Sequence, residues 1–371
     1  MKFSNANIFI TEEKRFAKGS ITFDNCITDI QIGDTEGGED LGGKYIIPGL
    51  IDVHTHGRYG ADFMTSTLEE CNEGAKKYLS HGVTTLYPCV MTADIEDIFA
   101  AIEKIKNLEH INVDGIHIEG PYVSPKRPGC HIIEKLRRPD VNELSGLCFA
   151  ISPKRVHITI APEIPGADEF IDKALALGCT LGIGHSDADY NSSVEAVKRG
   201  CVSFTHTYNA MRPLNHREPG TVGAALVSGA YAEFICDGFH VHKDAIDLAY
   251  RCVGNDRFVL VSDSISAADM PDGVYTLADS QVTVKGIEVR NEEGVIAGSA
   301  LNIFDAVKNL ARFAHISFEE ALISGTKNPA KMVGIYSHTG SLDKGKRADM
   351  CVLDENGNIE RVFVSGRQFS E

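Results

Sequence analysis

The amino-acid sequence predicts an α/β protein with two parts: a (β/α)8 barrel of the TIM type, and a small β-sandwich domain formed by both chain termini. Three observations in the 371-residue chain support this prediction. Eight short apolar runs recur through the middle, helical patterning fills most gaps between them, and both ends alternate β-prone runs with turns. This alternation is typical of a barrel. A doubly wound parallel sheet is the alternative, but the number and spacing of the runs favour the barrel.

The two chain ends are expected to build the small domain. Each end carries short runs rich in β-branched and aromatic residues, separated by Gly, Asn and Asp. The Gly- and acid-rich stretch 33–43 is predicted to be a loop. We therefore assign residues 1–46 and 335–371 to the sandwich and residues 47–334 to the barrel. The β-prone runs lie at 8–10, 20–23, 28–32, 348–354 and 359–366.

The barrel elements follow in order along the middle of the chain. Short buried strands alternate with helices in this fold, so each apolar run is expected to be a strand. A hairpin-rich insertion at residues 270–296 is expected between strand eight and the last helix. The predicted strands are 50–53, 83–88, 115–120, 156–163, 180–185, 202–206, 233–238 and 258–263. Helical patterning is clearest at 68–82, 94–108, 168–178 and 192–200.

Composition narrows the class of protein. The chain has 43% hydrophobic and 24% charged residues, which is the composition of a soluble globular protein. The formal charge of −16 argues against nucleic acid and anionic membranes as partners. No apolar run approaches the roughly 18 residues that a membrane span requires, and no signal peptide is recognisable. Ten cysteines without a CxxC pair indicate reduced thiols and a cytoplasmic protein.

Ionisable residues stand at the carboxyl ends of five predicted strands. These ends converge on one mouth in a barrel, the face where such enzymes carry out chemistry. Imidazoles and carboxylates together are the ligands of zinc, iron and similar divalent ions, and a bound ion lowers the pKa of its water from about 15.7 towards 7. Each residue alone is also compatible with a structural role, such as a helix N-cap. The residues are His54, His56, Glu119, His185, His206 and Asp263.

Several longer motifs carry a resemblance to a known family. They are PGLIDVHTHG (48–57), HIEGPY (117–122), GHSDAD (184–189), FTHTYNAM (204–211), HREPG (216–220), CDGFHV (236–241), LVSDSI (260–265) and AGSAL (297–301). With these motifs the chain resembles the amidohydrolase superfamily and, more closely, its N-acetylglucosamine-6-phosphate deacetylases. The resemblance spans nearly the whole chain, including the tail GSLDKGKRADMCVLD.

The resemblance implies a metal-dependent hydrolase. Glu119, His185 and His206 are implied to bind the principal divalent ion, with Asp263 as the catalytic acid/base. Zinc is the expected metal, with iron(II) or another divalent ion as the alternative. Predicted strand four ends in IAPE, without the lysine that many superfamily relatives use as a bridging ligand after carboxylation.

A second metal ion is implied by the first-strand motif. Members of the family carry either Gln-x-Asn, with one ion, or His-x-His, which can hold two. This chain has His54 and His56. The resemblance therefore implies a second ion, bridged through Glu119 and touching Asp263, so that each subunit holds one or two ions.

The resemblance also implies how substrate is bound. His131 is expected beside the scissile acetamide, and Arg217, with His216 next to it, is expected to clamp a phosphate. In the family this arginine and the histidine at position 240 complete the site at a subunit interface, which implies a homodimer. The residues implied to contact substrate are Cys130, His131, Asn209, Ala210, Arg217, His240, Ile296, Ala297 and Gly298.

The implied reaction is hydrolysis of the acetamide of N-acetyl-D-glucosamine 6-phosphate to D-glucosamine 6-phosphate and acetate, in amino-sugar catabolism. Three alternatives remain at this point. The first alternative is deacetylation of the galactosamine epimer, N-acetylgalactosamine 6-phosphate, which differs at one hydroxyl. The second is a cyclic-amide hydrolase, which the missing lysine disfavours. The third is a non-catalytic amidohydrolase-like binding protein. The intact set of ionisable residues argues against the last.

Overall fold

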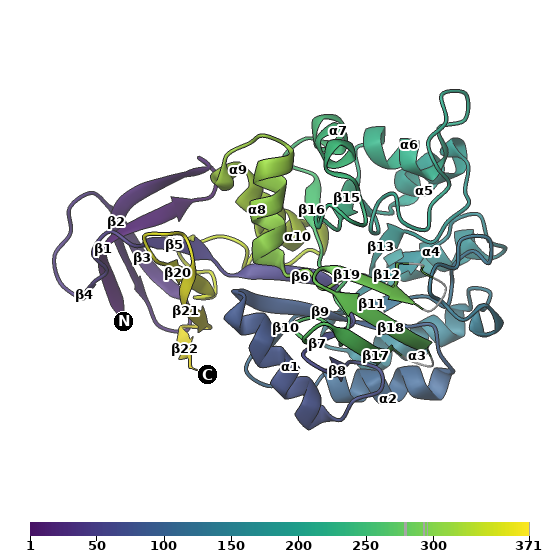
Figure 1. Ribbon diagram of the computed structural model, residues 1–371, viewed down its shortest axis with the longest axis horizontal. Helices are drawn as coiled ribbons and strands as arrows, with labels where there is room; N and C mark the ends of the chain where they lie inside the picture. Colours follow the sequence, from purple (N-terminus) through teal and green to yellow (C-terminus); the bar gives the residue numbers. More distant parts are fainter. Residues whose placement is uncertain (278–279, 292–293, 295, 371) are drawn as a thin grey trace.

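The computed structural model describes residues 1–277, 280–291, 294 and 296–370. It contains a barrel and, beside it, a separate sheet domain in which the two ends of the chain meet (Figure 1). Both parts of the predicted architecture are therefore confirmed. Among the described helices, none is long and apolar enough to cross a membrane.

Eight parallel strands form the barrel, and all eight predicted barrel strands are confirmed. Their ladders are continuous from the first strand to the eighth. The backbone N–H of Asp263 donates to the carbonyl of His54 at 2.9 Å, which ties the end of the last strand to the first. The strands are β6 (Leu50–Thr55), β9 (Val83–Met91), β11 (Gly115–Glu119), β12 (Arg155–Ile160), β13 (Thr180–Ile183), β14 (Ser203–Phe204), β15 (Tyr231–Phe234) and β16 (Phe258–Leu260), with the two-residue β10 (Asn112–Val113) beside β9.

Helices cover the outside of the barrel (Figure 1). Helix α1 has one apolar face, which packs on the strands and consists of the buried residues Cys71, Ala75, Tyr78 and Leu79 at helical spacing. A capping box at Thr67 starts this helix. The four predicted helices correspond to α1, α2, α4 and α5. The helices are α1 (Leu68–Ser80), α2 (Ile95–Ile105), α3 (Val141–Ile151), α4 (Ala167–Ala176), α5 (Tyr190–Arg199), α6 (Gly220–Val227), α7 (Lys243–Val253), α8 (Ile303–Phe313), α9 (Phe318–Leu322) and α10 (Lys327–Met332), with 3₁₀ turns at Ile133–Lys135 and Ile323–Gly325.

The sheet domain joins the two chain ends through one continuous set of ladders. Its order is β22-β21-β20-β5-β1-β2-β3, with β4 beside β1, so C-terminal strands pair with β5 from the N-terminal part. Phe3, Ile21, Phe23, Met350 and Phe363 are buried in its own apolar core. The strands are β1 (Lys2–Ile10), β2 (Arg15–Phe23), β3 (Ile27–Ile32), β4 (Glu39–Asp40), β5 (Tyr45–Pro48), β20 (Met350–Leu353), β21 (Ile359–Val364) and β22 (Arg367–Phe369).

The division of the chain at residues 46/47 and 334/335 stays a prediction. Strand β5 ends at Pro48 and pairs inside the sheet domain, and β6 begins the barrel two residues later. The predicted insertion folds as a small antiparallel sheet of β17 (Gly273–Leu277), β18 (Ser280–Lys285) and β19 (Glu288–Asn291). A short pair, β7 (Gly57–Arg58) and β8 (Ala61–Asp62), follows the first barrel strand.

Candidate active site and metal centre

The six ionisable residues predicted from strand ends meet at one end of the barrel. Glu119 is the last residue of β11, and His54 lies within β6 with His56 just after it. His185, His206 and Asp263 follow β13, β14 and β16 and adopt positive φ values of 46°, 29° and 48°. Non-glycine residues seldom adopt this backbone conformation, which costs of order 1–3 kcal/mol and is frequent at functional sites.

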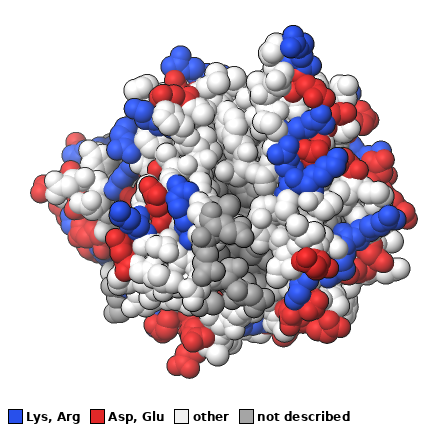
Figure 2. All heavy atoms as spheres, turned by 45° about the vertical axis from the view of Figure 1, so that its right-hand side comes forward, with Lys and Arg blue, Asp and Glu red and all other residues white. Residues whose placement is uncertain are grey.

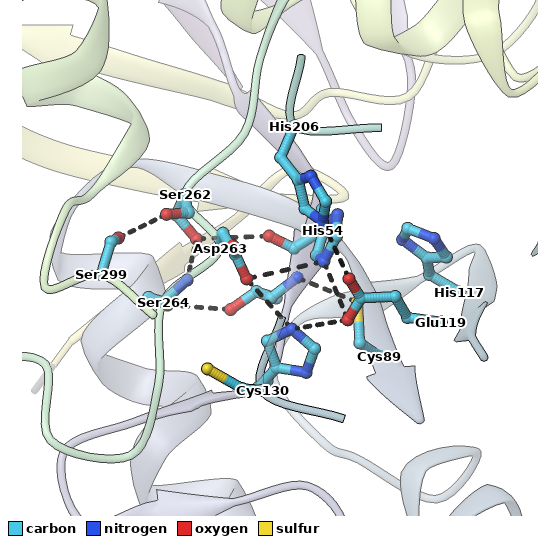
Figure 3. Close-up of polar contacts among 12 residues, drawn as sticks. His54, Cys89, His117, Glu119, Cys130, His206, Ser262, Asp263, Ser264 and Ser299 are labelled. Carbon is cyan, nitrogen blue, oxygen red and sulfur yellow. Dashed lines mark hydrogen bonds and ion pairs between the residues drawn. The ribbon is translucent and has the colours of Figure 1, made fainter. Parts of the chain in front are cut away.

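Glu119 lies at the centre of the cluster and presents one carboxylate oxygen to each side (Figure 3). Its Oε1 lies 3.0 Å from Nε2 of His185 and 3.0 Å from Nε2 of His206, and these two nitrogens are also 3.0 Å apart. Nδ1 of His185 donates to the carbonyl of Arg127 at 3.0 Å, which leaves Nε2 with its lone pair towards Glu119. Three donor atoms thus converge on one point.

The other oxygen of Glu119 faces the histidines of the first strand. Oε2 lies 3.4 Å from Nε2 of His54 and 3.2 Å from Nε2 of His56. Oδ1 of Asp263 lies 3.5 Å and 3.0 Å from the same two nitrogens. A second convergent set of two imidazoles and two carboxylates therefore lies beside the first, and Glu119 belongs to both.

Both sets fit a divalent ion. Donor atoms bound to one zinc at about 2.0–2.2 Å lie roughly 3–3.5 Å from each other, which is the spacing found in both sets. Among the described residues, Nε2 of His54, which faces Glu119 and Asp263 in the second set, is buried without a hydrogen-bond partner. Unpartnered buried polar atoms are costly unless a ligand takes them. The donors match Zn²⁺ or Fe²⁺ better than Mg²⁺ because most are imidazoles.

Electrostatics keeps the acids of the cluster ionised. Burial works to raise the pKa of Glu119, but His54, His185 and His206 hold it well below its usual range. Burial likewise acts on Asp263, yet the charges of His54 and His56 and the hydrogen bond from His56 lower its pKa to about 2. Both residues are therefore carboxylates at neutral pH, the form that binds a cation or accepts a proton.

His131 differs from the other imidazoles. Its ring packs edge-on against His185 at a centroid distance of 4.4 Å, and among the described residues neither ring nitrogen has a hydrogen-bond partner. Burial, reinforced by the neighbouring His185, lowers the pKa of His131 to about 3. A neutral imidazole beside the cluster can donate one N–H to an oxygen atom of a ligand.

A pocket of about 460 Å³ opens above the cluster. It brings together eight of the nine residues predicted to contact substrate, which lie on four separate segments of the chain. Gly298 has a φ of 73°, and a Cβ there would lie 2.2 Å from the side chain of Ile265, so glycine is required at this wall. Of the predicted substrate residues, the pocket is lined by Cys130, His131, Asn209, Ala210, His240, Ile296, Ala297 and Gly298.

The ninth residue, Arg217, lines a neighbouring cavity of about 530 Å³ together with Arg127 and Arg212. Arg127 lines both spaces and so connects them. Arg127 pairs with Asp187, and Arg212 with a glutamate, whereas the exposed guanidinium of Arg217 has no partner among the described residues. Lys and Arg side chains gather beside a hollow on one face of the molecule (Figure 2).

Sequence reasoning missed several residues of this region. Arg127 and Arg212 were not predicted, although Arg127 stands in the basic run PKRPG just before Cys130. Cys89 and His117 form a further group with His54 inside the barrel, with potential ligand atoms within 4.8 Å of one another. Glu233 lies in the same interior. A charged residue inside an apolar strand, as in YAEFI, is the signal that would have pointed to it.

The comparisons with known proteins agree with this geometry. The sequence profile of the Amidohydrolase family matches residues 45–369. An N-acetylglucosamine-6-phosphate deacetylase from Vibrio furnissii is 38% identical over 88% of this chain and 83% of its own. An N-acetylgalactosamine-6-phosphate deacetylase from Escherichia coli O157:H7 is 34% identical over 95% of this chain and 93% of its own.

A solved structure extends the comparison to the fold. A mutant N-acetyl-D-glucosamine-6-phosphate deacetylase from Mycobacterium smegmatis, in complex with N-acetyl-D-glucosamine-6-phosphate, superposes with a TM-score of 0.91 and 29% identity. The superposition covers 99% of this chain and 98% of the other. The structural match includes the sheet domain as well as the barrel, and the family profile includes the barrel with β5 and β20–β22 of the sheet domain. The chain therefore belongs to the amidohydrolase family and, within it, to the group of the N-acetylglucosamine-6-phosphate deacetylases.

Proposed function

We propose that the protein hydrolyses the acetamide of N-acetyl-D-glucosamine 6-phosphate, giving D-glucosamine 6-phosphate and acetate. The observation that carries the proposal is the double role of Glu119, whose two oxygens face two histidine pairs directly beneath the pocket. The relatives named for this activity support the choice of substrate. The same geometry argues against a non-catalytic binding protein, which needs no such convergence of buried donors.

A divalent ion held by Glu119, His185 and His206 would supply an electrophile for the acetyl carbonyl and a water of lowered pKa. Zinc is the metal we propose, with iron(II) as the alternative, because both suit imidazole and carboxylate ligands. His54, His56, Glu119 and Asp263 would hold a second ion, as the 3.0–3.5 Å separations of their donor atoms suggest.

Asp263 is proposed to move the proton. Its pKa of about 2 keeps it ionised, and it lines the pocket, so it can accept a proton from the attacking water. It then delivers that proton to the amine nitrogen as the C–N bond breaks, because an expelled amide anion would be far too basic. Neutral His131 is proposed to donate an N–H to the carbonyl oxygen as negative charge develops there.

The sugar is proposed to lie across the 460 Å³ pocket. Asn209 and Ala210 would make polar contacts from the loop after β14. Asp237 holds Nδ1 of His240 at 2.6 Å, which fixes that ring and leaves its Nε2 for the substrate. The wall of Ile296, Ala297 and Gly298 would bound the sugar on the side of the insertion, where the carbonyl of Ile296 accepts a hydrogen bond from Cys130.

Arg217 is proposed to bind the phosphate. A guanidinium matches phosphate oxygens bidentately, and in a protein of charge −16 the affinity for an anion must come from a few local cations. Arg217 lies in the cavity next to the sugar pocket, with His216 adjacent in the chain. We propose a homodimer in which this arginine completes the site of the neighbouring subunit. We also propose a cytoplasmic location, which the ten unpaired cysteines support.

The decisive experiment measures acetate release after the purified protein is reloaded with Zn²⁺ or Fe²⁺. Four substrates are compared: the 6-phosphates of N-acetylglucosamine and N-acetylgalactosamine and the two unphosphorylated sugars. The proposal expects the highest kcat/KM for the glucosamine phosphate. A preference for the galactosamine phosphate would instead favour the function of the Escherichia coli relative, which matches this chain over a longer span. The control is protein treated with a chelator.

The second ion has a separate test. The set of Glu119, His185 and His206 does not include the first-strand histidines, so replacing both His54 and His56 by Ala should lower the number of bound ions while the principal ion stays. Metal analysis by mass spectrometry gives the stoichiometry of wild type and variant. Loss of all metal from the double variant would contradict two independent sites.

A further inference from the structure

One carboxylate inside the barrel has no part in the reaction as described so far. Glu233 belongs to β15 and is fully buried. The hydroxyl of Ser203 donates to its Oε1 at 2.8 Å, and Nε2 of His157 lies 3.6 Å from the same atom. Its other oxygen, Oε2, has no hydrogen-bond partner among the described residues. Burying a carboxylate is expensive unless both oxygens are satisfied.

The nearest ion-pair partner of that unsatisfied oxygen is a histidine of the second metal set. Nδ1 of His54 lies 3.9 Å from Oε2 of Glu233 and, within the described chain, is also buried without a hydrogen-bond partner. The opposite nitrogen of the ring, Nε2, faces Glu119 and Asp263 at 3.4 Å and 3.5 Å. The imidazole of His54 therefore lies between one carboxylate on its inner side and two on its outer side.

A histidine must be neutral to bind a metal ion, and a neutral imidazole has a proton on one ring nitrogen and a lone pair on the other. If Nδ1 holds the proton and donates it to an acceptor, then Nε2 presents its lone pair on the opposite side. Metal-bound histidines generally have such an acceptor, which fixes the tautomer and the orientation of the ring. Cys89 and His117 also lie close to His54, but within the described chain Glu233 is the carboxylate whose unused oxygen lies on the Nδ1 side of this ring.

We propose that Glu233 is a positioning residue that holds the Nδ1 proton of His54 and thereby keeps Nε2 available to the second divalent ion. The inference rests on the two-ion form of the proposed function. Ser203 and His157 hold Glu233 on the side away from His54. The hydroxyl of Ser203 donates to Oε1 of Glu233, and Nδ1 of the neighbouring His157 lies 2.9 Å from the hydroxyl oxygen of Thr180. The carboxylate thus has one oxygen anchored in the barrel wall and the other directed to the metal ligand.

A purely structural role for Glu233 predicts something different. In that case the carboxylate serves only Ser203 and His157, and its loss lowers the stability of the barrel without distinguishing between the two ions. In a positioning role, its loss weakens the ion bound through His54. It spares the ion bound through His185 and His206, whose rings form no ion pair with Glu233 in the part of the chain that the structure describes.

The test compares Glu233→Gln and Glu233→Met with wild type by chelator competition with Zn²⁺ and by metal stoichiometry. Gln keeps a weaker acceptor, and Met removes the acceptor at similar length. Loss of an outer-shell partner typically costs about 10–100-fold in metal affinity, so the second ion should weaken by that factor, more for Met than for Gln. The first ion should change less than about threefold. Equal affinities for the second ion in all three proteins would overturn the proposal.

The matched control is Asp349→Asn, which also converts a buried carboxylate into an amide, but in the sheet domain. It is expected to lower the melting temperature and to leave both metal affinities unchanged. If this control weakens the second ion as much as Glu233→Gln does, the effect is general loss of stability and the proposal is wrong.

A second measurement needs no variant of Glu233. In zinc-loaded wild-type protein with ¹⁵N-labelled histidine, the ring spectrum should show His54 protonated at Nδ1, its signal assigned by its absence in His54→Asn. A proton on Nε2 would overturn the proposal even if the Glu233 variants failed to fold. Wild-type protein that binds a single ion would refute the second site together with this inference, whereas two ions with unchanged affinities in the variants would refute the inference alone.

Discussion

Both ends of the barrel bury a cluster of charged residues, but the two clusters differ in how many of their polar atoms have hydrogen-bond partners within the protein. At the end that joins the sheet domain, Asp114 accepts from Arg347 at 2.8 Å and lies 3.2 Å from His338. Arg347 also donates to Thr85 and to Asp349. Among the described residues, each of the polar groups named here has a protein partner.

At the opposite end, the imidazoles are left with unused nitrogens. Both nitrogens of His54 and of His131 are buried without hydrogen-bond partners among the described residues, and the donors around Glu119 converge instead of pairing off. A high density of buried charge therefore does not by itself identify a functional site. What identifies it is a set of buried donors that the protein itself leaves unsatisfied.

The largest effect is expected from Glu119→Gln. The carboxylate is the one group shared by both donor sets, and a neutral amide cannot offset the charge of the ions. Bound metal and activity should be lost together, which metal analysis and acetate release measure on the same sample. Full metal occupancy with normal turnover in this variant would show that the cluster around Glu119 is not a metal centre. It would also contradict the functional difference that we draw between the two ends of the barrel.

Asp263→Asn should separate chemistry from metal binding. The variant is expected to keep its fold and at least the principal ion, while kcat falls by about 10²–10⁴-fold, the usual contribution of a general acid–base group. Circular dichroism and metal stoichiometry control for the fold and the ion. Turnover above about a tenth of wild type would remove Asp263 from the proton transfer.

Arg217→Ala tests the cation without a partner. KM for the 6-phosphate is expected to rise about 10–100-fold, which corresponds to the loss of about 1.5–3 kcal/mol from a charge-assisted contact, and KM for the unphosphorylated sugar should change little. Equal losses on both sugars would contradict the phosphate role.

The same variant tests the dimer. Mixing Arg217→Ala protomers with protomers inactivated at Asp263 should regenerate activity, because one site of each mixed dimer would have both residues intact. If mixing restores nothing, Arg217 serves the site of its own subunit.

The smallest effect on catalysis is expected from a change at the end of the barrel that joins the sheet domain. Asp114→Asn breaks the pair with Arg347 and should lower the free energy of unfolding by about 1–3 kcal/mol, with kcat within about twofold of wild type. Urea unfolding and steady-state kinetics measure the two quantities. A strong loss of activity without loss of stability would contradict a structural role for this cluster.

The stability effect of Asp114 should also depend on pH. Burial acts to raise its pKa, but the hydrogen bond and charge of Arg347, with His338, lower the pKa below its ordinary value. The folded-state pKa is thus below the unfolded one, so the ionised carboxylate stabilises the protein above about pH 4, and this contribution is lost as the pH falls further. The difference in stability between wild type and Asp114→Asn should shrink as the pH is lowered through that range.

The barrel, its eight strands and the six ionisable residues at the strand ends could all be predicted from the amino-acid sequence. Strand runs and strand-end residues are local features of the chain, and barrel topology carries every carboxyl end to one mouth, so His54, Glu119 and His185 could be placed near each other without coordinates. The sandwich was predicted because β-prone runs alternate with turn residues at both chain ends. The sequence did not reveal that β5 is the strand through which the C-terminal part joins β1.

The relative positions of these side chains could not be predicted from the sequence and became known from the three-dimensional structure. It turned one oxygen of Glu119 to each histidine pair, placed Arg127 between the sugar pocket and the cavity of Arg217, and set Glu233 behind His54. The physical reason is that hydrogen bonding and metal coordination depend on differences of less than an ångström between atoms of distant strands. Periodicity in a sequence fixes which face a residue occupies, but the packing of the whole barrel sets those distances.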